Sequence, residues 1–186
     1  ITVLFFPVTY IFADILTEVY GYANARNVLW TVMICSIAAG LIYLGVALFP
    51  PSHIFDANES YKRVLGNVPR IIIGGWLAVF SGDITNNFVL AKMKILTKGK
   101  YLWTRTIGST VVGEFVNTAV FYLIGLYGIL PFNILITSIL SGWTIKVLVE
   151  VVFTPVTYIV VAKLKKAENE DYYDDKTNFN PFLFKS

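Results

Sequence analysis

Residues 105–126 read RTIGSTVVGEFVNTAVFYLIGL. Their charged side chains are Arg105, at one end, and Glu114, near the middle. A helix that crosses the hydrocarbon core of a bilayer needs roughly 20 mostly apolar residues, and this stretch meets that requirement. Four further stretches do so as well: 1–21, 28–49, 69–91 and 132–162. The sequence therefore predicts an all-α, polytopic membrane bundle with five spans.

The composition supports a membrane protein and excludes several other classes. The 186 residues are 56% hydrophobic and 15% charged, with a mean hydropathy of +0.65, whereas soluble domains are about 45–50% apolar and about 25% charged. The net charge of +3 comes from 15 Lys and Arg residues scattered between apolar runs, which argues against nucleic-acid binding. Cys35 and His53 are the single cysteine and histidine, so we expect no disulfide framework, metal site or cofactor.

The distribution of basic residues predicts the orientation. Residues 92–105 hold five Lys or Arg, the tail from Lys163 holds five more, and the turn 22–27 holds one. The loops expected on the other side, 50–70 and 127–131, hold three and none. Because basic loops stay in the cytoplasm, we expect a multi-pass membrane protein with a cytoplasmic C-terminus. The chain opens on ITVLFFPVTYIF, without a Met or a basic stretch, so we expect it to begin after a missing first helix, giving six spans.

Two regions follow from this pattern. Residues 1–165 form the transmembrane domain, and 166–186 form an acidic, flexible cytoplasmic tail. The last apolar run, 132–162, is too long for one straight span at about 1.5 Å per residue. We expect its helix to run to about Phe153 and then to bend at Pro155.

Six ionisable side chains lie inside the apolar stretches: Asp14, Glu18, Asp83, Glu114, Lys146 and Glu150. Each costs at least about 2.5–3.5 kcal/mol at the centre of a spanning helix, so such residues indicate function by default. Two structural alternatives remain open. Lys146 and Glu150, four residues apart, could neutralise each other, and Asp14 could only bridge to a neighbouring helix.

An internal repeat joins two of the acids to amides. Gly82-Asp83-Ile84-Thr85-Asn86 aligns with Gly113-Glu114-Phe115-Val116-Asn117 at a shift of 31 residues. The acid and the Asn share a helix face, and the two helices run in opposite directions, so both pairs can converge on one polar cavity. Trp76 and Trp143 lie deep in their spans, where they could stack on a planar ligand or simply pack in the core.

These residues resemble the queuosine-precursor transporter family, also called the vitamin uptake transporter family. The resemblance covers residues 1 to about 165 in order. Its motifs are Asp14-Ile15-Leu16-Thr17-Glu18-Val19-Tyr20-Gly21 with Ala25-Arg26, then Pro69-Arg70-Ile71, the two repeat motifs, Lys98-Gly99-Lys100-Tyr101-Leu102-Trp103-Thr104-Arg105 with Ser109-Thr110, Lys146-Val147-Leu148-Val149-Glu150, and Thr154-Pro155-Val156-Thr157-Tyr158.

The resemblance implies a six-helix inner-membrane protein that imports deazaguanine compounds, namely queuine, preQ0 or preQ1, for the synthesis of queuosine in tRNA. The family's repeat motifs read Gly-Gln-x-x-Asp, whereas acid and amide have exchanged places here. A carboxylate can accept from the ring N–H and exocyclic amine of a guanine-like edge, and an amide can donate to its carbonyl.

We therefore assign base recognition to Glu114 and Asp83, assisted by Asn86 and Asn117. We expect Asp14 and Glu18 to line the same cavity or carry a coupling proton. Lys146 would balance the negative charge of the empty site. We expect Glu150, Trp76 and Trp143 to contribute to substrate binding as well.

Three classes compete for this sequence. The first is a secondary transporter that works alone, and the second is a substrate-capture subunit of an energy-coupling-factor-type vitamin importer. Transport without a partner module would distinguish them. An intramembrane enzyme is not expected, because one Cys and one His supply no recognisable catalytic set. The expected partners are a small-molecule cargo and the lipid bilayer, and a homodimer stays open.

Overall fold

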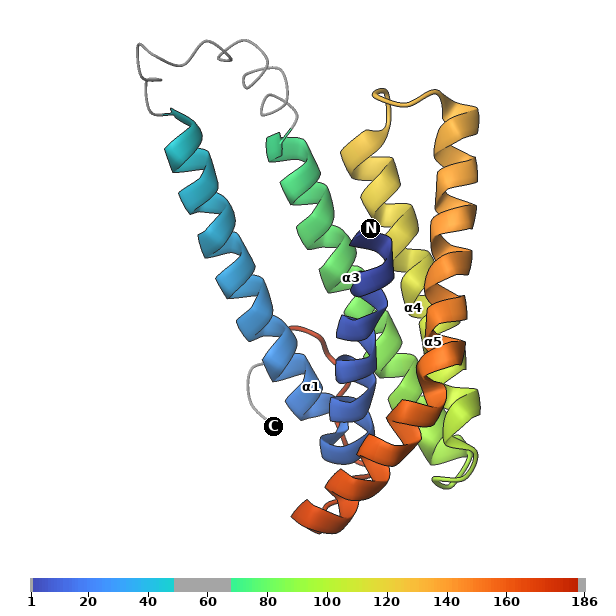
Figure 1. Ribbon diagram of the computed structural model, residues 1–186. Helices are drawn as coiled ribbons and strands as arrows, with labels where there is room; N and C mark the ends of the chain where they lie inside the picture. The colour runs from blue at the N-terminus through green and yellow to red at the C-terminus, as the bar shows by residue number, and fades with distance from the viewer. Residues whose placement is uncertain (1, 49–67, 184–186) are drawn as a thin grey trace.

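The fold is a helical bundle, seen in a computed structural model that describes residues 2–48 and 68–183 (Figure 1). Its elements are α1 (Thr2–Leu48), α3 (Val68–Leu96), α4 (Leu102–Phe121), the short π-helical segment η1 (Tyr122–Leu126) and α5 (Phe132–Glu168). Every element of the described residues is helical, which confirms the predicted fold class for this part of the chain. The described parts of the first two predicted spans, 2–21 and 28–48, both lie in α1.

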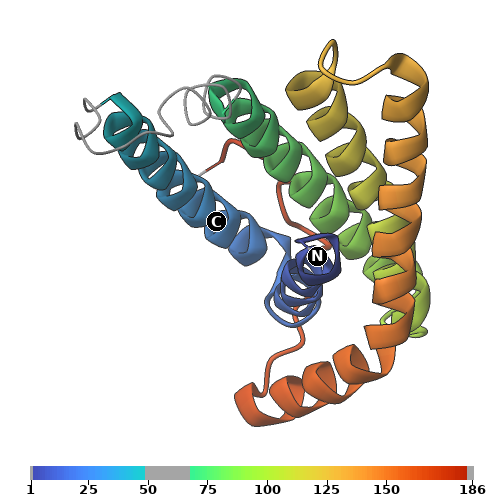
Figure 2. The ribbon, with the colours of Figure 1, turned by 45° about the horizontal axis from the view of Figure 1, so that its top comes forward.

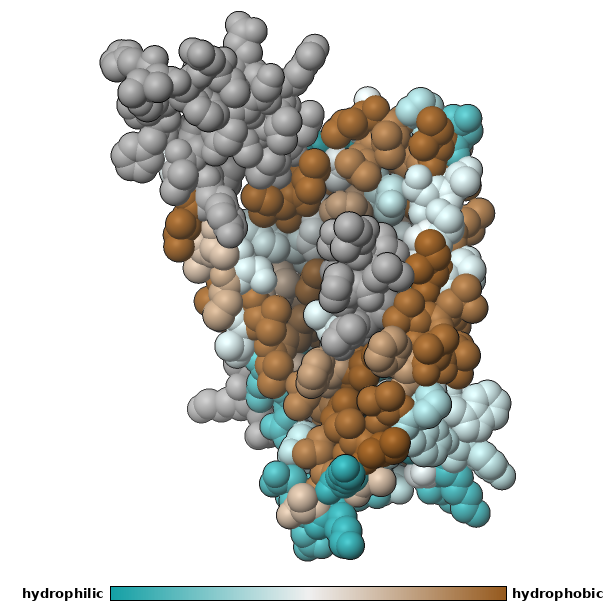
Figure 3. All heavy atoms as spheres, in the orientation of Figure 1, coloured by the Kyte–Doolittle hydropathy of each residue, from teal (hydrophilic) through white to brown (hydrophobic). Residues whose placement is uncertain are grey.

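Three stretches of the described residues are long and apolar enough to cross a membrane: Thr9–Ile42, Leu102–Leu126 and Phe132–Glu168. The count of five spans, and of six in a longer chain, stays a prediction. Figure 3 shows apolar residues over much of the visible face and hydrophilic residues gathered at the end where α5 ends. We call this the basic end, because it holds the α3–α4 turn and Lys163 to Lys166.

A kink at Gly21 divides α1 into two arms that diverge in Figures 1 and 2. Gly21 has φ 82° and ψ 169°, a conformation that glycine adopts without the steric cost of a Cβ. A Cβ on Gly21 would also lie 2.3 Å from a ring carbon of Tyr172. The turn predicted at 22–27 is therefore wrong in position, because the chain changes direction at Gly21 and is helical again from Tyr22.

The most extensive interface in the bundle joins α3 to α4. A tight turn links these antiparallel helices, with left-handed backbone at Lys98, Gly99 and Tyr101. The two repeat motifs therefore lie on neighbouring helices that run in opposite directions, as the sequence predicted.

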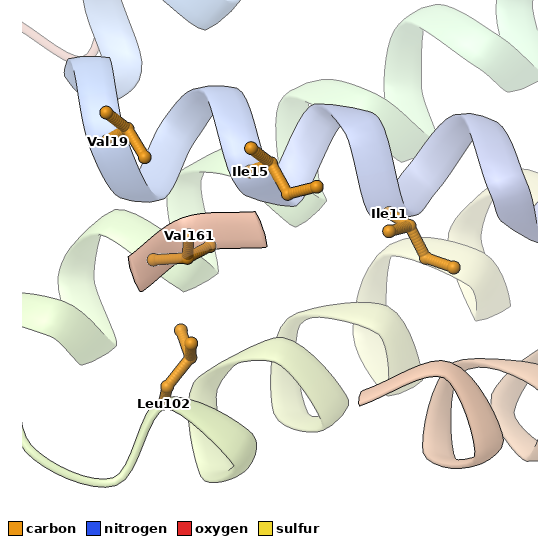
Figure 4. Packing of buried hydrophobic residues seen from close by; sticks show 5 residues of the cluster. All are labelled: Ile11, Ile15, Val19, Leu102 and Val161. Atoms are coloured by element: carbon orange, nitrogen blue, oxygen red, sulfur yellow. The ribbon is translucent and has the colours of Figure 1, made fainter. Parts of the chain in front are cut away.

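The interior contains more than an apolar core. A small cluster of Ile11, Ile15, Val19, Leu102 and Val161 joins the first arm of α1 to the start of α4 and to α5 (Figure 4). Beside it, α1, α3, α4 and α5 bury acids, amides and basic side chains. Large apolar residues such as Leu148 and Val152 are instead 57% and 72% exposed. This distribution suits a bundle whose outer surface contacts lipid, where polar residues face the interior.

α5 continues as one helix through Pro155 to Glu168. The sequence predicted a helix to about Phe153 followed by a bend at Pro155. The helix continues beyond Phe153, and its ribbon bends in the C-terminal part (Figures 1 and 2). Proline removes one backbone hydrogen bond and crowds the preceding turn, which accounts for a bend rather than an end.

Residues 169–183 form a segment that we call the C-terminal strap. It runs along α1, where the Tyr172 N–H donates to the Val19 carbonyl at 3.1 Å and the Trp30 indole donates to the Pro181 carbonyl at 2.8 Å. The Arg26 guanidinium donates to the carbonyls of Asn178 and Asn180. These contacts hold residues 169–183 against the kinked helix, and the flexibility predicted for the tail 166–186 stays a prediction.

Candidate functional site

The two repeat motifs lie against each other at the crossing of α3 and α4. A Cβ on Gly82 would lie 2.5 Å from the Asn117 Cβ, and a Cβ on Gly113 would lie 2.6 Å from the Asn86 Cβ. Each glycine therefore makes room for the asparagine of the other motif. This reciprocal contact brings both acid–amide pairs to one place, as the repeat predicted.

α1 joins this crossing through Asp14. The Asn86 amide donates to one oxygen of the fully buried Asp14 carboxylate at 2.5 Å. One turn earlier, the Tyr10 hydroxyl interacts with the half-buried carboxylate of Asp83. The bridge between Asp14 and a neighbouring helix, left open by the sequence, is thus present.

α5 supplies the cation. The Lys146 ammonium donates to the carboxylate of Glu114 at 2.8 Å, to the amide oxygen of Asn117 at 3.0 Å and to the hydroxyl of Thr118 at 3.1 Å. The ion pair at Lys146 is therefore formed with Glu114 on another helix. Neither Glu150 oxygen has a hydrogen-bond partner among the described residues, so Lys146 and Glu150 share no hydrogen bond.

We name this group the polar cluster; it comprises Asp14, Asp83, Asn86, Glu114, Asn117, Lys146 and Glu150. Several of its buried atoms have no hydrogen-bond partner among the described residues: Asp14 Oδ2, Asn86 Oδ1, Glu114 Oε1, Asn117 Nδ2 and both oxygens of Glu150. Buried polar atoms nearly always have partners, so such a concentration indicates a ligand or ordered water. No three His, Cys, Asp or Glu side chains in the described ranges are placed to hold a metal ion.

The two tryptophans make other contacts. The Trp143 indole donates to the Val111 carbonyl at 2.9 Å, and its ring meets Phe115 edge-on at 5.7 Å. The ring of Trp76 lies against Gly40 of α1, where an added Cβ would be 2.6 Å from it. Both rings therefore pack between helices, the alternative that the sequence left open beside stacking on a ligand.

Glu18 belongs to a second group at the basic end. Its carboxylate accepts two hydrogen bonds from Arg105, both at 2.7 Å, and one from Lys165 at 2.7 Å. The Lys94 ammonium lies 3.7 Å from the same carboxylate and 2.7 Å from Asp171 of the strap. The structure thus places Glu18 among cations one turn from Asp14, in what we call the ion-pair cluster: Glu18, Lys94, Arg105, Lys165 and Asp171.

Asp171 connects this cluster to the strap. Burial alone raises the pKa of the Asp171 carboxyl, but hydrogen bonds donated by Lys165 and Lys94 outweigh burial, and the pKa lies below its ordinary value. The carboxyl is therefore charged at neutral pH, and its attraction to the two lysines holds the start of the strap against α3 and α5.

The sequence did not single out several residues of the two clusters. Tyr10 and Thr118 were available from spacing, since each lies four residues from Asp14 or Glu114 on the same helix face. Lys94 and Arg105 were counted as loop residues, yet both are 1% exposed. Only the need of Glu18 for a cationic partner could have indicated them.

Comparison with known proteins agrees with this architecture. The model of the family described as "Putative vitamin uptake transporter" matches residues 1–160. A Bacillus subtilis (strain 168) protein described as "Probable queuosine precursor transporter" is 30% identical over 146 residues, which cover 78% of this chain and 64% of that protein. The chain thus spans less than two-thirds of this relative. No solved structure matches the chain.

The family match covers the whole polar cluster and three residues of the ion-pair cluster, Glu18, Lys94 and Arg105. Lys165, Asp171 and the whole strap lie beyond it. It agrees with the family indicated by the sequence motifs, and the apolar helices are those of a multi-pass membrane protein. The chain belongs to the putative vitamin uptake transporter family.

Proposed function

We propose that this protein imports queuosine precursors across the cell membrane and holds them at the polar cluster. The cargo is a 7-deazaguanine-type base, preQ0, preQ1 or queuine, which serves queuosine modification of tRNA. The observation that carries the proposal is the set of unpartnered buried atoms where the two repeat motifs cross. The relative's description as a probable queuosine precursor transporter supports the class of cargo.

The unpartnered atoms match the edge of such a base. The Glu114 carboxylate can accept from the ring N–H and the exocyclic amine, one donor on each oxygen, since a carboxylate can take two donors from one edge. Its Oε1 has no partner, and its Oε2 also accepts from Lys146. Asn117 Nδ2 is a donor for the base carbonyl, and Asn86 Oδ1 is an acceptor for the pyrrole N–H. Asp83, half-buried beside them, adds a further acceptor.

Lys146 has a different task in this proposal. It holds Glu114 and Asn117 in place through hydrogen bonds and offsets one of the cluster's negative charges. Without it, Glu114 would be buried as an uncompensated charge, which is strongly unfavourable in a membrane interior. The cargo then meets a carboxylate whose orientation is already fixed.

A direct binding measurement tests the proposal. The purified chain should bind one base among preQ0, preQ1, queuine and guanine in a calorimetric titration. Glu114→Gln removes a charged acceptor, so it should weaken that binding by about 10- to 100-fold, as loss of a charged hydrogen bond costs about 1.5–3 kcal/mol. Glu168→Gln, an exposed acid at the end of α5, should leave the affinity unchanged.

Two results would contradict the proposal. Unchanged affinity in a folded Glu114→Gln protein would remove the assignment of this residue, and failure of the folded chain to bind any of the four bases would remove the cargo class. A separate experiment measures uptake into liposomes by the chain alone. Uptake indicates an independent transporter, and binding without uptake indicates a capture subunit that needs an energy-coupling module.

A further inference from the structure

Glu150 and Asp14 are the two acids of the polar cluster to which the proposed function assigns no contact with the base. Both carboxyl groups are 0% exposed. Neither oxygen of Glu150 has a hydrogen-bond partner among the described residues, and Asp14 Oδ2 also lacks one. The two carboxyl groups interact electrostatically across the contact between α1 and α5.

The charges around this pair do not compensate it. The titratable and charged groups that face it are Tyr10 and Glu18 on α1, Asp83 on α3, Glu114 on α4 and Lys146 on α5. The Lys146 ammonium is engaged with Glu114, and the cations of the ion-pair cluster surround Glu18. Two buried carboxylates that repel each other, and that accept no hydrogen bond from a cation of the described residues, are costly to keep ionised together.

A proton fits this place better than a metal ion. Calcium and similar cations take six or more oxygen ligands, whereas the pair offers two carboxyl groups, and the described residues hold no group of three acids or other ligands arranged for a metal. Asn86 donates to Asp14 Oδ1, which leaves Oδ2 as the oxygen that can carry or share a proton.

We propose that Asp14 and Glu150 form a proton-binding site, in which one proton is held between α1 and α5 and is exchanged with water during transport. Binding converts one carboxylate of the pair to a carboxylic acid, and release returns the proton to water and restores the negative charge. Because the pair repels itself when both members are ionised, the contact between α1 and α5 is favoured by the proton and weakened by its loss.

Infrared spectroscopy of the purified full chain tests the site without any cargo. At neutral pH the wild-type protein should show the carbonyl band of a buried carboxylic acid. The band should lose intensity in Glu150→Gln or Asp14→Asn, whereas Glu168→Gln on the exposed end of α5 should leave it unchanged. Equal band intensity in the wild type and in the folded double variant with Asp14→Asn and Glu150→Gln would mean that neither carboxyl carries the proton, and would overturn the proposal.

A second arm, which rests on the proposed function, measures whether the proton moves with the cargo. In liposomes with an alkaline lumen, coupling to one proton should raise the ratio of the base's concentration inside to that outside about tenfold per pH unit across the membrane. Glu150→Gln should lose this dependence. Uptake that ignores the pH gradient in the wild type would overturn the coupling, and absence of uptake of every base would overturn the proposed function while the infrared band still decides the site.

Discussion

Gly82 and Gly113 show how a single missing side chain positions a site. Each removes the Cβ that would otherwise collide with the asparagine of the opposite motif. The asparagines then sit deep in the crossing, where Asn86 reaches Asp14 and Asn117 reaches Lys146. The glycines of the repeat therefore serve close packing, and the polar residues that follow them serve the site.

We expect Gly113→Ala to destabilise the protein by about 1–3 kcal/mol, the usual cost of overpacking a tight interface. Its Cβ would meet the Asn86 Cβ at 2.6 Å and the Asn86 backbone at about 3.0 Å, so α3 and α4 would have to separate. Thermal unfolding in detergent should show a lower midpoint.

Gly75→Ala is the matched control for this substitution. It lies on α3, and a Cβ there has no atom within 4 Å. It should leave the midpoint unchanged or raise it slightly, since Ala is favoured over Gly in a helix by up to about 1 kcal/mol. Equal effects of the two substitutions would show that the crossing is not tightly packed.

At the scale of elements, the break in α1 is stabilised by a residue from the far end of the chain. Both oxygens of the Asp174 carboxylate accept from the Tyr22 N–H, at 3.2 and 3.0 Å, and Asp174 is 2% exposed. A carboxylate at the start of a helix caps a free N–H and interacts well with the helix dipole. The strap thus supplies the cap that the second arm of α1 lacks in its own sequence.

Asp174→Ala should cost about 0.5–2 kcal/mol, the range for loss of an N-terminal cap. Because the strap also loses its buried anchor, we expect faster hydrogen exchange at Tyr22 and faster proteolysis between residues 169 and 183. Asp175→Ala changes an exposed neighbour and should have neither effect. If the two variants exchange and cleave alike, the strap does not depend on this cap.

The sequence predicted the helices better than their ends. Apolar length located α3, α4 and α5, and the Gly-acid-Asn repeat predicted which faces of α3 and α4 meet. It did not place the bend of α1 at Gly21, because the local sequence allows a turn as well as a kink, and the choice depends on Tyr172 and Asp174 more than 150 residues away. Composition likewise cannot reveal that an acidic tail has buried partners.

At the scale of the whole molecule, the charged end and the polar interior are separate. The polar cluster lies at the crossing of α3 and α4, and the ion-pair cluster closes the basic end beneath it, where α4 starts and α5 ends. The basic loops of the sequence therefore also contribute buried partners, since Arg105 and Lys94 neutralise Glu18. The cytoplasmic side of these loops stays a prediction, which labelling can test.

Single-cysteine variants should reveal this orientation. Cys35 is the one cysteine, so Cys35→Ser gives a suitable background. In this background Lys166→Cys, at the exposed basic end, should react with a membrane-impermeant maleimide only after the cells are opened. Ile129→Cys, 43% exposed in the turn between α4 and α5, should react in intact cells. The opposite pattern would show that the bundle is inserted the other way.

The reciprocal fit of Gly82 with Asn117 and Gly113 with Asn86 also limits which parts of the protein can move. Sliding α3 along α4 would move each asparagine away from the glycine of the opposite motif and against a residue that has a side chain. Rotation of either helix about its axis is blocked in the same way. We therefore expect α3 and α4 to move together as one rigid body. In this view α1 and α5 are the helices that move, and alternating access is their motion relative to the α3–α4 pair.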